Sequence, residues 1–271
     1  MGDTPLDAGA IRQFRSRYGP WALVTGASSG IGAEFARQLA ARGLDVILCA
    51  RRREPMEKLA AQLTAEHGVK AHVVSIDLSQ PDFLDALRPE LVQRQVGLLV
   101  SCAGFALTGP LLAHREEAEL ALFDTNCRAP LRLLHLLVPP MVSRRSGGVI
   151  VVSSITALLP VPYWTGYAAS KAHGLAIAQG LAHELRGSGV DVLAVCPGST
   201  ATEFHSVAGC RDDFCIPAPV VVRAALSALG RRQLVLPGLQ AKFLYGLSRL
   251  LPRSLMVRIW AHVVRGMANS A

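Results

Sequence analysis

Short apolar runs alternate with longer amphipathic segments from Trp21 to about Leu236. The apolar runs predict strands at 22–24, 46–49, 72–76, 98–100, 149–152, 190–195 and 234–236. The segments between them predict helices at 31–42, 55–67, 81–94, 116–144, 165–187 and 218–230. The apolar runs lack strict polar alternation, which is typical of strands buried on both faces. This alternation predicts right-handed crossovers and one parallel sheet covered by helices on both faces.

The pattern changes near residue 239. Residues 1–238 contain no internal repeat and no long linker, so we expect one doubly wound α/β domain with a seven-stranded sheet. In residues 239–271, apolar positions recur at helical spacing, with Lys and Arg on the other side. We expect an extension of two amphipathic helices, packed on or near the substrate side of the domain.

Charge is concentrated in the same C-terminal part. The formal net charge is +8, yet residues 214–271 contain no Asp or Glu and eight Lys or Arg. Basic segments suggest nucleic acid or an anionic membrane. Because no aromatic platform accompanies the charge, we expect no nucleic acid to bind. Two hypotheses stay open for residues 239–271: a lid or subunit contact, or peripheral attachment to a membrane surface.

Composition sets the remaining limits. With 271 residues, 51% of them apolar, the chain can bury a large core. It has no apolar run long enough for a signal peptide or a membrane span. Several of its six cysteines fall in predicted strands, which favours free thiols and a cytoplasmic setting. Cys210 and Cys215 flank a loop without further metal ligands, so we expect unlinked thiols and no metal site.

A glycine-rich turn at residues 25–32 follows the first predicted strand and opens a predicted helix. The start of a helix offers unpaired N–H groups and a partial positive charge to a phosphate. Gly26, Gly30 and Gly32 remove side chains where the backbone turns tightly and approaches a pyrophosphate. The turn therefore predicts a bound dinucleotide.

Tyr167 and Lys171 lie four residues apart in a predicted helix, so they share one face. A nearby ammonium lowers a tyrosine pKa that is ordinarily about 10. Such a tyrosine can give a proton to a ketone oxygen or take one from an alcohol. Ser154, at the end of a predicted strand, can hydrogen-bond the same oxygen. In isolation, the pair would indicate a solvated helix face and the serine a turn or cap.

The chain resembles the short-chain dehydrogenase/reductase family over roughly residues 18–205. The resemblance rests on the Thr-Gly-x-x-x-Gly-x-Gly turn, Ala103–Gly104, the segment 197–202 and the four residues Asn126, Ser154, Tyr167 and Lys171. Residues 21–53 are also similar to the branch that contains steroid and long-chain 3-ketoacyl reductases. The resemblance implies a Rossmann fold, hydride transfer between a nicotinamide dinucleotide and a carbonyl or alcohol, and a homodimer or homotetramer built through helices 116–144 and 165–187.

Family motifs also imply roles for individual residues. The catalytic residues are Asn126, Ser154, Tyr167 and Lys171, with Asn126 holding a water next to Lys171. The cofactor-binding residues are Gly26, Ser28, Ser29, Gly30, Ile31, Gly32, Arg51, Arg52, Asp77, Leu78, Ala103, Gly104, Tyr167, Lys171, Pro197, Gly198, Thr200 and Thr202. In one departure, Ser101-Cys102 stands where the family usually has Asn-Asn. A thiol is a poorer hydrogen-bond partner than an amide, so we expect a local loss of stability rather than of chemistry.

The end of the second predicted strand indicates which cofactor binds. Ala50 occupies the position where an acidic residue would hold the ribose 2′-OH of NAD. Arg51 offers a permanently charged planar fork that suits a 2′-phosphate, although a solvated basic turn would look the same. We predict NADP(H).

The substrate loop implied by the family is residues 203–217, and it holds no cluster of Lys or Arg. We therefore expect a neutral or apolar carbonyl substrate such as a steroid or a 3-ketoacyl compound. Phe105, Leu107 and Trp164 could supply apolar walls, and His205 is either a substrate contact or a solvated loop residue. The leading hypothesis is an NADPH-dependent carbonyl reductase, or the reverse alcohol dehydrogenase. The alternative is a catalytically silent dinucleotide-binding sensor or scaffold.

Overall fold

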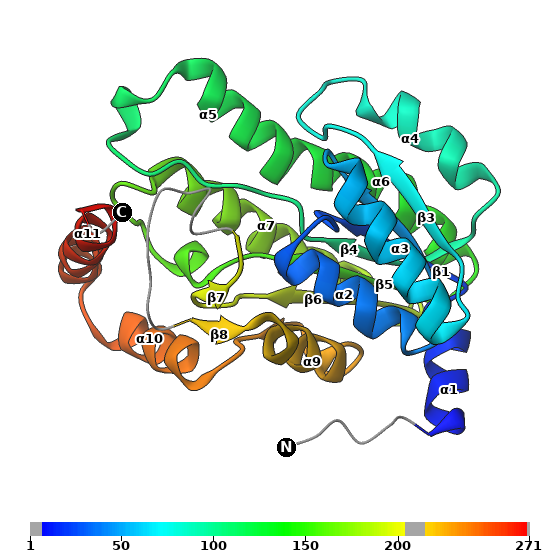
Figure 1. The fold of residues 1–271 in the computed structure, drawn as a ribbon. Coiled ribbons are helices and arrows are strands. Elements are labelled where there is room, and N and C mark those ends of the chain that lie inside the picture. The colour runs from blue at the N-terminus through cyan, green and yellow to red at the C-terminus, as the bar shows by residue number, and fades with distance from the viewer. Residues whose placement is uncertain (1–6, 204–214, 270–271) are drawn as a thin grey trace.

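The computed structural model describes residues 7–203 and 215–269. Seven strands form one parallel sheet in the order β3-β2-β1-β4-β5-β6-β9. They are β1 (Trp21–Thr25), β2 (Asp45–Ala50), β3 (Ala71–Ser75), β4 (Val96–Ser101), β5 (Gly147–Val152), β6 (Val190–Val195) and β9 (Leu234–Val235). The direction of winding changes between β1 and β4, which is where doubly wound sheets bind ligands. The predicted fold class is confirmed (Figure 1).

Helices cover both faces of the sheet. One apolar cluster joins α1 (Ala8–Tyr18), α2 (Gly30–Ala40), α3 (Arg53–His67) and α9 (Ala218–Ala228) to one face. A second cluster joins α4 (Phe83–Val92), α6 (Ala129–Ser143) and α7 (Thr165–Glu184) to the other. Successive strand residues alternate between the two clusters, as Leu23 and Val24 do. Both faces of the sheet are therefore covered, which explains why the strands lack strict polar alternation.

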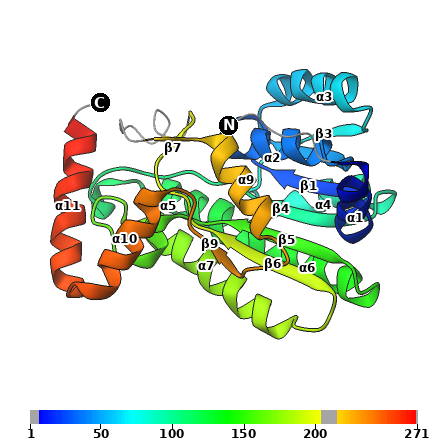
Figure 2. The ribbon, with the colours of Figure 1, turned by 90° about the horizontal axis from the view of Figure 1, so that it is seen from below.

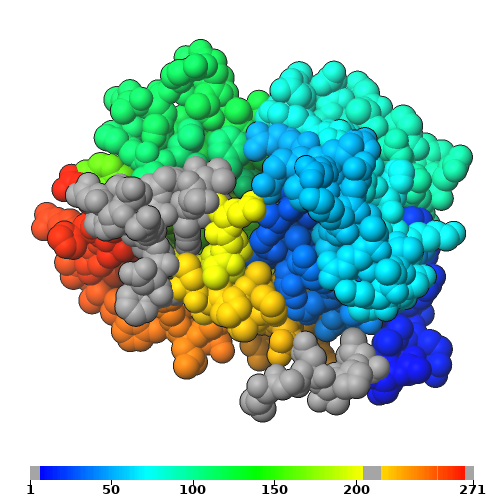
Figure 3. All heavy atoms as spheres, in the orientation of Figure 1, coloured from blue at the N-terminus to red at the C-terminus, as the bar shows by residue number. Residues whose placement is uncertain are grey.

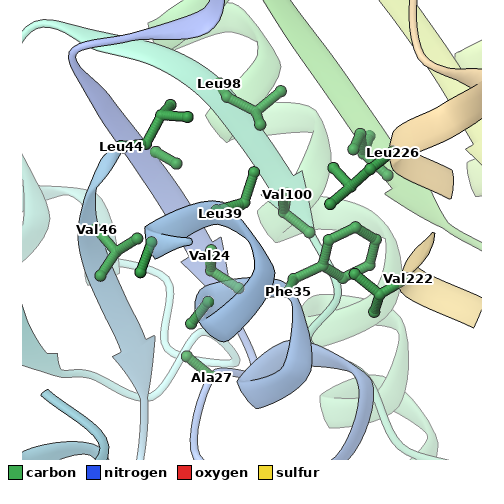
Figure 4. Packing of buried hydrophobic residues seen from close by; sticks show 14 of the residues in the cluster. Val24, Ala27, Phe35, Leu39, Leu44, Val46, Leu98, Val100, Val222 and Leu226 are labelled. Atoms are coloured by element: carbon green, nitrogen blue, oxygen red, sulfur yellow. The ribbon is translucent and has the colours of Figure 1, made fainter. Parts of the chain in front are cut away.

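The packing around α2 fixes the start of that helix against the sheet. Phe35 and Leu39 project from α2 onto Val24 and Val100 of the neighbouring strands, and α9 closes the cluster from the side (Figure 4). Phe35 and Leu39 are both fully buried. Because this helix and β1 flank the glycine-rich turn, their packing holds the turn at the carboxyl edge of the sheet.

The helix expected over 116–144 is interrupted. It consists of α5 (Glu116–Phe123), one π-helical turn (Asp124–Arg128) and α6. Single π turns within helices are frequent at functional sites, and this one carries Asn126. Two further features escaped the sequence pattern: helix α1, and a small two-stranded sheet of β7 (Thr200–Ala201) and β8 (Ile216–Pro217).

The C-terminal extension forms α10 (Leu239–Leu250) and α11 (Arg253–Asn269). Both lie at the end of the molecule opposite α1 (Figures 1 and 2). Met256 and Trp260 of α11 are buried in a third apolar cluster with Leu122 and Trp164. The helices of the described ranges include none that is both long and apolar enough to cross a bilayer.

Candidate active site

A cavity of about 620 Å³ opens at the carboxyl ends of the parallel strands. Its wall includes every predicted catalytic and cofactor-binding residue except Asn126, whose neighbour Thr125 does line it. Segments that are far apart in sequence, from the glycine-rich turn to α11, thus meet around one space. The cavity has a polar part near β1 and β2 and an apolar part beneath α10 and α11.

The glycine-rich turn is tight enough that its glycines are obligatory. Gly26 and Gly30 have positive φ values of 71° and 56°, a region that side chains disfavour. A Cβ on Gly32 would lie 2.2 Å from the carbonyl oxygen of Gly26. The turn leads into α2, whose N-cap Ser29 makes no side-chain capping bond. The first residues of α2 (30–32) line the cavity, so the turn fits a pyrophosphate.

Two arginines stand at the end of β2. Arg52 donates hydrogen bonds to Glu203 Oε2 (2.7 Å) and Ser28 Oγ (3.3 Å), and the Arg52 contact lowers the pKa of the Glu203 carboxyl. Arg51 is exposed and forms no ion pair with the described residues. The segment that carries Glu203 therefore lies against the N-terminal part of the chain (Figure 3). Thr202 also contacts Gly30 there, since a Cβ on Gly30 would lie 3.0 Å from it.

The ends of β3 and β4 complete the polar part of the cavity. Asp77 Oδ1 accepts hydrogen bonds from the backbone N–H (3.0 Å) and hydroxyl (2.9 Å) of Ser79, which fixes its turn. Thr25 Oγ1 accepts from the N–H groups of Cys102 (3.0 Å) and Ala103 (3.1 Å). Backbone groups, not the Cys102 side chain, thus join the β4 turn to β1. Burial raises the pKa of the Cys102 thiol to about 11.

Tyr167 and Lys171 are both buried on the face of α7 that borders the cavity. Lys171 Nζ donates a hydrogen bond to the carbonyl oxygen of Val152 (3.0 Å) and lies 5.7 Å from the centre of the Tyr167 ring. Burial lowers the pKa of Lys171 from its usual value of 10.5. Ser153 Oγ donates to the Lys171 carbonyl oxygen (2.7 Å), which fastens α7 to the end of β5.

Ser154 follows β5 and begins a short 3₁₀ turn (Ile155–Leu158). Its Oγ accepts a hydrogen bond from Thr156 N–H (3.2 Å), so the hydroxyl hydrogen is not used in that bond. Ser154 is buried and lines the cavity together with Tyr167. The end of β5 and helix α7 therefore each place a hydroxyl group in the wall of the same cavity.

Asn126 makes three side-chain hydrogen bonds close to Tyr167 and Lys171. Its Nδ2 donates to the Phe105 carbonyl oxygen (3.0 Å) and to Ser170 Oγ (2.9 Å), while Oδ1 accepts from Phe105 N–H (3.2 Å). Both amide hydrogens are thus engaged within the protein. The Asn126 oxygen lies across Gly104 from Lys171, because a Cβ on Gly104 would be 2.9 Å from Oδ1 and 3.3 Å from Nζ. This geometry assigns Asn126 a positioning role that the sequence did not predict.

The apolar part of the cavity is built largely by the extension. Phe105 and Trp164 line it, as expected, whereas Leu107 packs outside the wall in the third apolar cluster. The lining residues from the extension are Gln240, Leu244, Leu247, Met256, Ile259, Trp260 and Val263. Apart from Gln240, the extension therefore gives this part of the cavity an apolar or aromatic wall.

Comparison with known proteins gives independent evidence of the family. The chain matches the short chain dehydrogenase family model over residues 20–209. It belongs to the short-chain dehydrogenase/reductase family. A very-long-chain 3-oxoacyl-CoA reductase of Anas platyrhynchos is 29% identical over 247 residues, covering 89% of this chain and 78% of that protein.

Solved structures of the family resemble the whole fold. A structure from work on the stereoselectivity of a 7beta-hydroxysteroid dehydrogenase has a TM-score of 0.84 at 26% identity, covering 91% of this chain and 98% of its own. A short-chain dehydrogenase from Sphingobium yanoikuyae in complex with NADPH has a TM-score of 0.77 at 33% identity, covering 85% and 93%. The chain is thus an oxidoreductase of the short-chain dehydrogenase/reductase type, and its cofactor class is a nicotinamide dinucleotide.

Some residues singled out in the sequence do not lie in the cavity wall of the described structure. His205 and Cys210 lie outside the described residues, whereas Cys215 directly precedes β8. In the described ranges, no three His, Cys, Asp or Glu side chains are grouped to hold a metal ion. The sequence predicted that the extension packs on or near the substrate side, but it did not identify Met256 and Trp260 as residues of the cavity wall. Their helical spacing marked an apolar face, but a single amphipathic helix does not reveal which surface covers it.

Proposed function

We propose that this short-chain dehydrogenase/reductase is an NADPH-dependent carbonyl reductase that acts on bulky apolar ketones. One observation carries the proposal: Lys171 and Tyr167 line the cavity next to both of its parts. Lys171 Nζ lies beside Gly104, and Tyr167 belongs to the apolar cluster of Met256 and Trp260. A cofactor on one side and a carbonyl compound on the other would meet beside the Tyr167 phenol.

The residues at the end of β2 favour NADP(H) over NAD(H). No carboxylate stands at Ala50 to bind a ribose 2′-OH, and the Arg51 guanidinium is exposed at the cavity wall. A guanidinium suits the dianionic 2′-phosphate through paired charge-assisted hydrogen bonds. The NADPH complex of the Sphingobium yanoikuyae relative also supports this choice. When bound, the nicotinamide supplies the hydride.

The chain's own residues handle the substrate oxygen. Ser154 and Tyr167 would donate hydrogen bonds to the carbonyl oxygen and stabilise the negative charge that develops there. As hydride reaches the carbonyl carbon, Tyr167 gives its phenolic proton to that oxygen and an alcohol results. Lys171 stabilises the phenolate that remains, since its ammonium is close to the ring. Asn126 fixes the 104–105 turn relative to α7 by its hydrogen bonds to Phe105 and Ser170.

The cavity wall supports a substrate with a large apolar frame. Leu244, Leu247 and Trp260 present hydrocarbon and ring surface, and the Lys and Arg side chains of the wall, apart from Lys171, stand at the cofactor end. Relatives named as a very-long-chain 3-oxoacyl-CoA reductase and a 7beta-hydroxysteroid dehydrogenase suggest two such frames. Steroid ketones and long-chain 3-ketoacyl thioesters are therefore the substrates we propose.

Two further aspects of the proposal concern direction and assembly. The same site can run as an alcohol dehydrogenase, because proton and hydride transfer are reversible. A silent sensor or scaffold is disfavoured, since Ser154, Tyr167 and Lys171 are all present and line the same cavity. For the assembly we propose a homodimer through α6 and α7, where Leu131, Leu134 and Ile177 line a surface hollow of about 560 Å³.

A carbonyl panel tests the proposal directly. The purified protein is mixed with NADPH or NADH and with steroid ketones, 3-ketoacyl thioesters, quinones, short ketones and aldehydes, and cofactor oxidation is followed. We expect bulky ketones with NADPH to give the highest kcat/KM. Turnover that requires NADH would overturn the cofactor assignment, and activity confined to short polar aldehydes would overturn the substrate class.

A further inference from the structure

Helix α10 is apolar on two faces, and the described residues cover only one of them. Leu244 and Leu247 line the cavity. Leu239, Phe243 and Leu250, at positions i, i+4 and i+11, form a separate stripe because each residue turns the helix by about 100°. These three side chains are 84%, 69% and 82% exposed. A stripe of this kind in contact with water needs a partner.

Helix α11 carries exposed apolar residues of its own. Leu255, Ile259 and Val263 recur at every fourth residue and are also exposed. Ile259 and Val263 belong to the cavity wall as well. The exposed apolar surface of the extension therefore reaches the part of the cavity proposed for the substrate. Both helices lie together at one end of the molecule (Figure 2).

Positive charge accompanies the apolar stripes. Lys242, Arg253 and Arg258 are exposed on the two helices and form no ion pair with the described residues. The chain has no Asp or Glu after residue 213, so nothing within this segment neutralises them. Arg265 differs, because its guanidinium contacts the Tyr163 hydroxyl. The surface thus combines exposed apolar side chains, of the kind that insert into a bilayer, with cations that form no ion pair with the described residues.

We propose that the outer surface of α10 and α11 docks on an anionic lipid bilayer, from which apolar substrate reaches the cavity. Amphipathic basic helices bind such surfaces by burying apolar side chains while Lys and Arg attract the headgroups. A second copy of this chain fits less well, since a two-fold contact would bring the same cations face to face. The delivery of substrate rests on the proposed function, but the docking itself does not.

Vesicle flotation tests the docking with the full-length protein. The probes are vesicles of phosphatidylcholine mixed with phosphatidylserine, and vesicles of phosphatidylcholine alone. The apolar variant combines Phe243→Ser and Leu250→Ser. Its matched control combines Val92→Ser and Leu112→Ser, whose side chains are 82% and 97% exposed on α4 and on the 3₁₀ turn Leu111–Ala113. None of the four lines the cavity, so we expect all proteins to keep their circular dichroism and melting temperature.

We expect the wild-type protein and the control to float with the anionic vesicles. The apolar variant should partition about a hundredfold less, at about tenfold for each apolar side chain that no longer enters the bilayer. Lys242→Gln combined with Arg253→Gln should weaken binding to the anionic vesicles by about 25-fold, at about fivefold per cation. Binding of the wild-type protein to phosphatidylcholine alone should be far weaker.

Three results would overturn the docking proposal. The first is a wild-type protein that stays in the bottom fraction of the gradient at every lipid concentration. The second is equal flotation of the apolar variant and its control. The third is a wild-type dimer that the apolar variant converts to a monomer without any vesicle binding, which would identify a second copy as the occupant. None of these results depends on turnover, so they leave the proposed reaction to its own test.

Discussion

Lys171 and Tyr167 lie one helical turn apart on α7, with the Lys171 ammonium 5.7 Å from the centre of the Tyr167 ring. The carbonyl oxygen of Val152, at the end of β5, accepts a hydrogen bond from the same ammonium. A buried cation is costly unless it is paired. The protein therefore sustains an unfavourable charge at the point where the proposed reaction needs one.

This cost predicts a pH dependence of stability. Burial lowers the pKa of Lys171 below 10.5, so the unfolded chain binds more protons than the folded one between the lowered pKa and 10.5. The contribution of Lys171 to stability therefore rises with pH across that window. We expect the free energy of unfolding of the wild-type protein, relative to Lys171→Met, to increase as the pH is raised toward 10. Urea titrations without cofactor measure it, and a difference that falls with pH would contradict it.

Arg51→Asp should shift the cofactor preference. The substitution removes the guanidinium proposed for the 2′-phosphate and adds a repelling charge. Loss of one charge-assisted contact raises the KM for NADPH about ten- to hundredfold, with a smaller change for NADH. Arg53→Asp is the matched control, because Arg53 pairs with Glu57 on α3 and is not in the cavity wall. Equal effects of the two substitutions would show that the preference reflects only general charge.

Asn126→Ala should lower the stability of the protein. The change leaves the backbone groups of Phe105 without their side-chain partner, and Ser170 loses a donor. We expect the free energy of unfolding to fall by about 2 kcal/mol, the usual cost of unpaired buried polar groups. Thr125→Ala, in the same π turn, serves as the control and should change stability little. An Asn126→Ala protein as stable as the wild type would contradict the positioning role of Asn126.

The sequence predicted the fold well because the fold depends on repeated patterns. Dry strands and amphipathic helices leave their spacing in the chain, and the turn glycines have no substitute: a Cβ on Gly32 would clash with Gly26. The residues expected after each strand lie together because parallel strands end at one edge.

Contacts between distant segments could not be predicted in the same way. The role of Asn126 depends on a π turn and on Phe105, which is 21 residues away. The Arg52–Glu203 ion pair joins residues 151 apart. Trp260 and Met256 were recognised as one apolar face, but only the fold shows that this face closes over Trp164. Such pairings depend on tertiary geometry, which local spacing does not encode.

The most direct test of the central claim is ketone reduction by Tyr167→Phe, followed as NADPH oxidation with the best bulky ketone of the panel. Tyr163→Phe is the matched control, since Tyr163 contacts Arg265 and does not line the cavity. If Tyr167 delivers the proton, kcat of Tyr167→Phe falls by about 10²- to 10⁴-fold while NADPH binding is retained and the control stays active. A Tyr167→Phe protein that reduces the ketone at the wild-type rate would contradict the account.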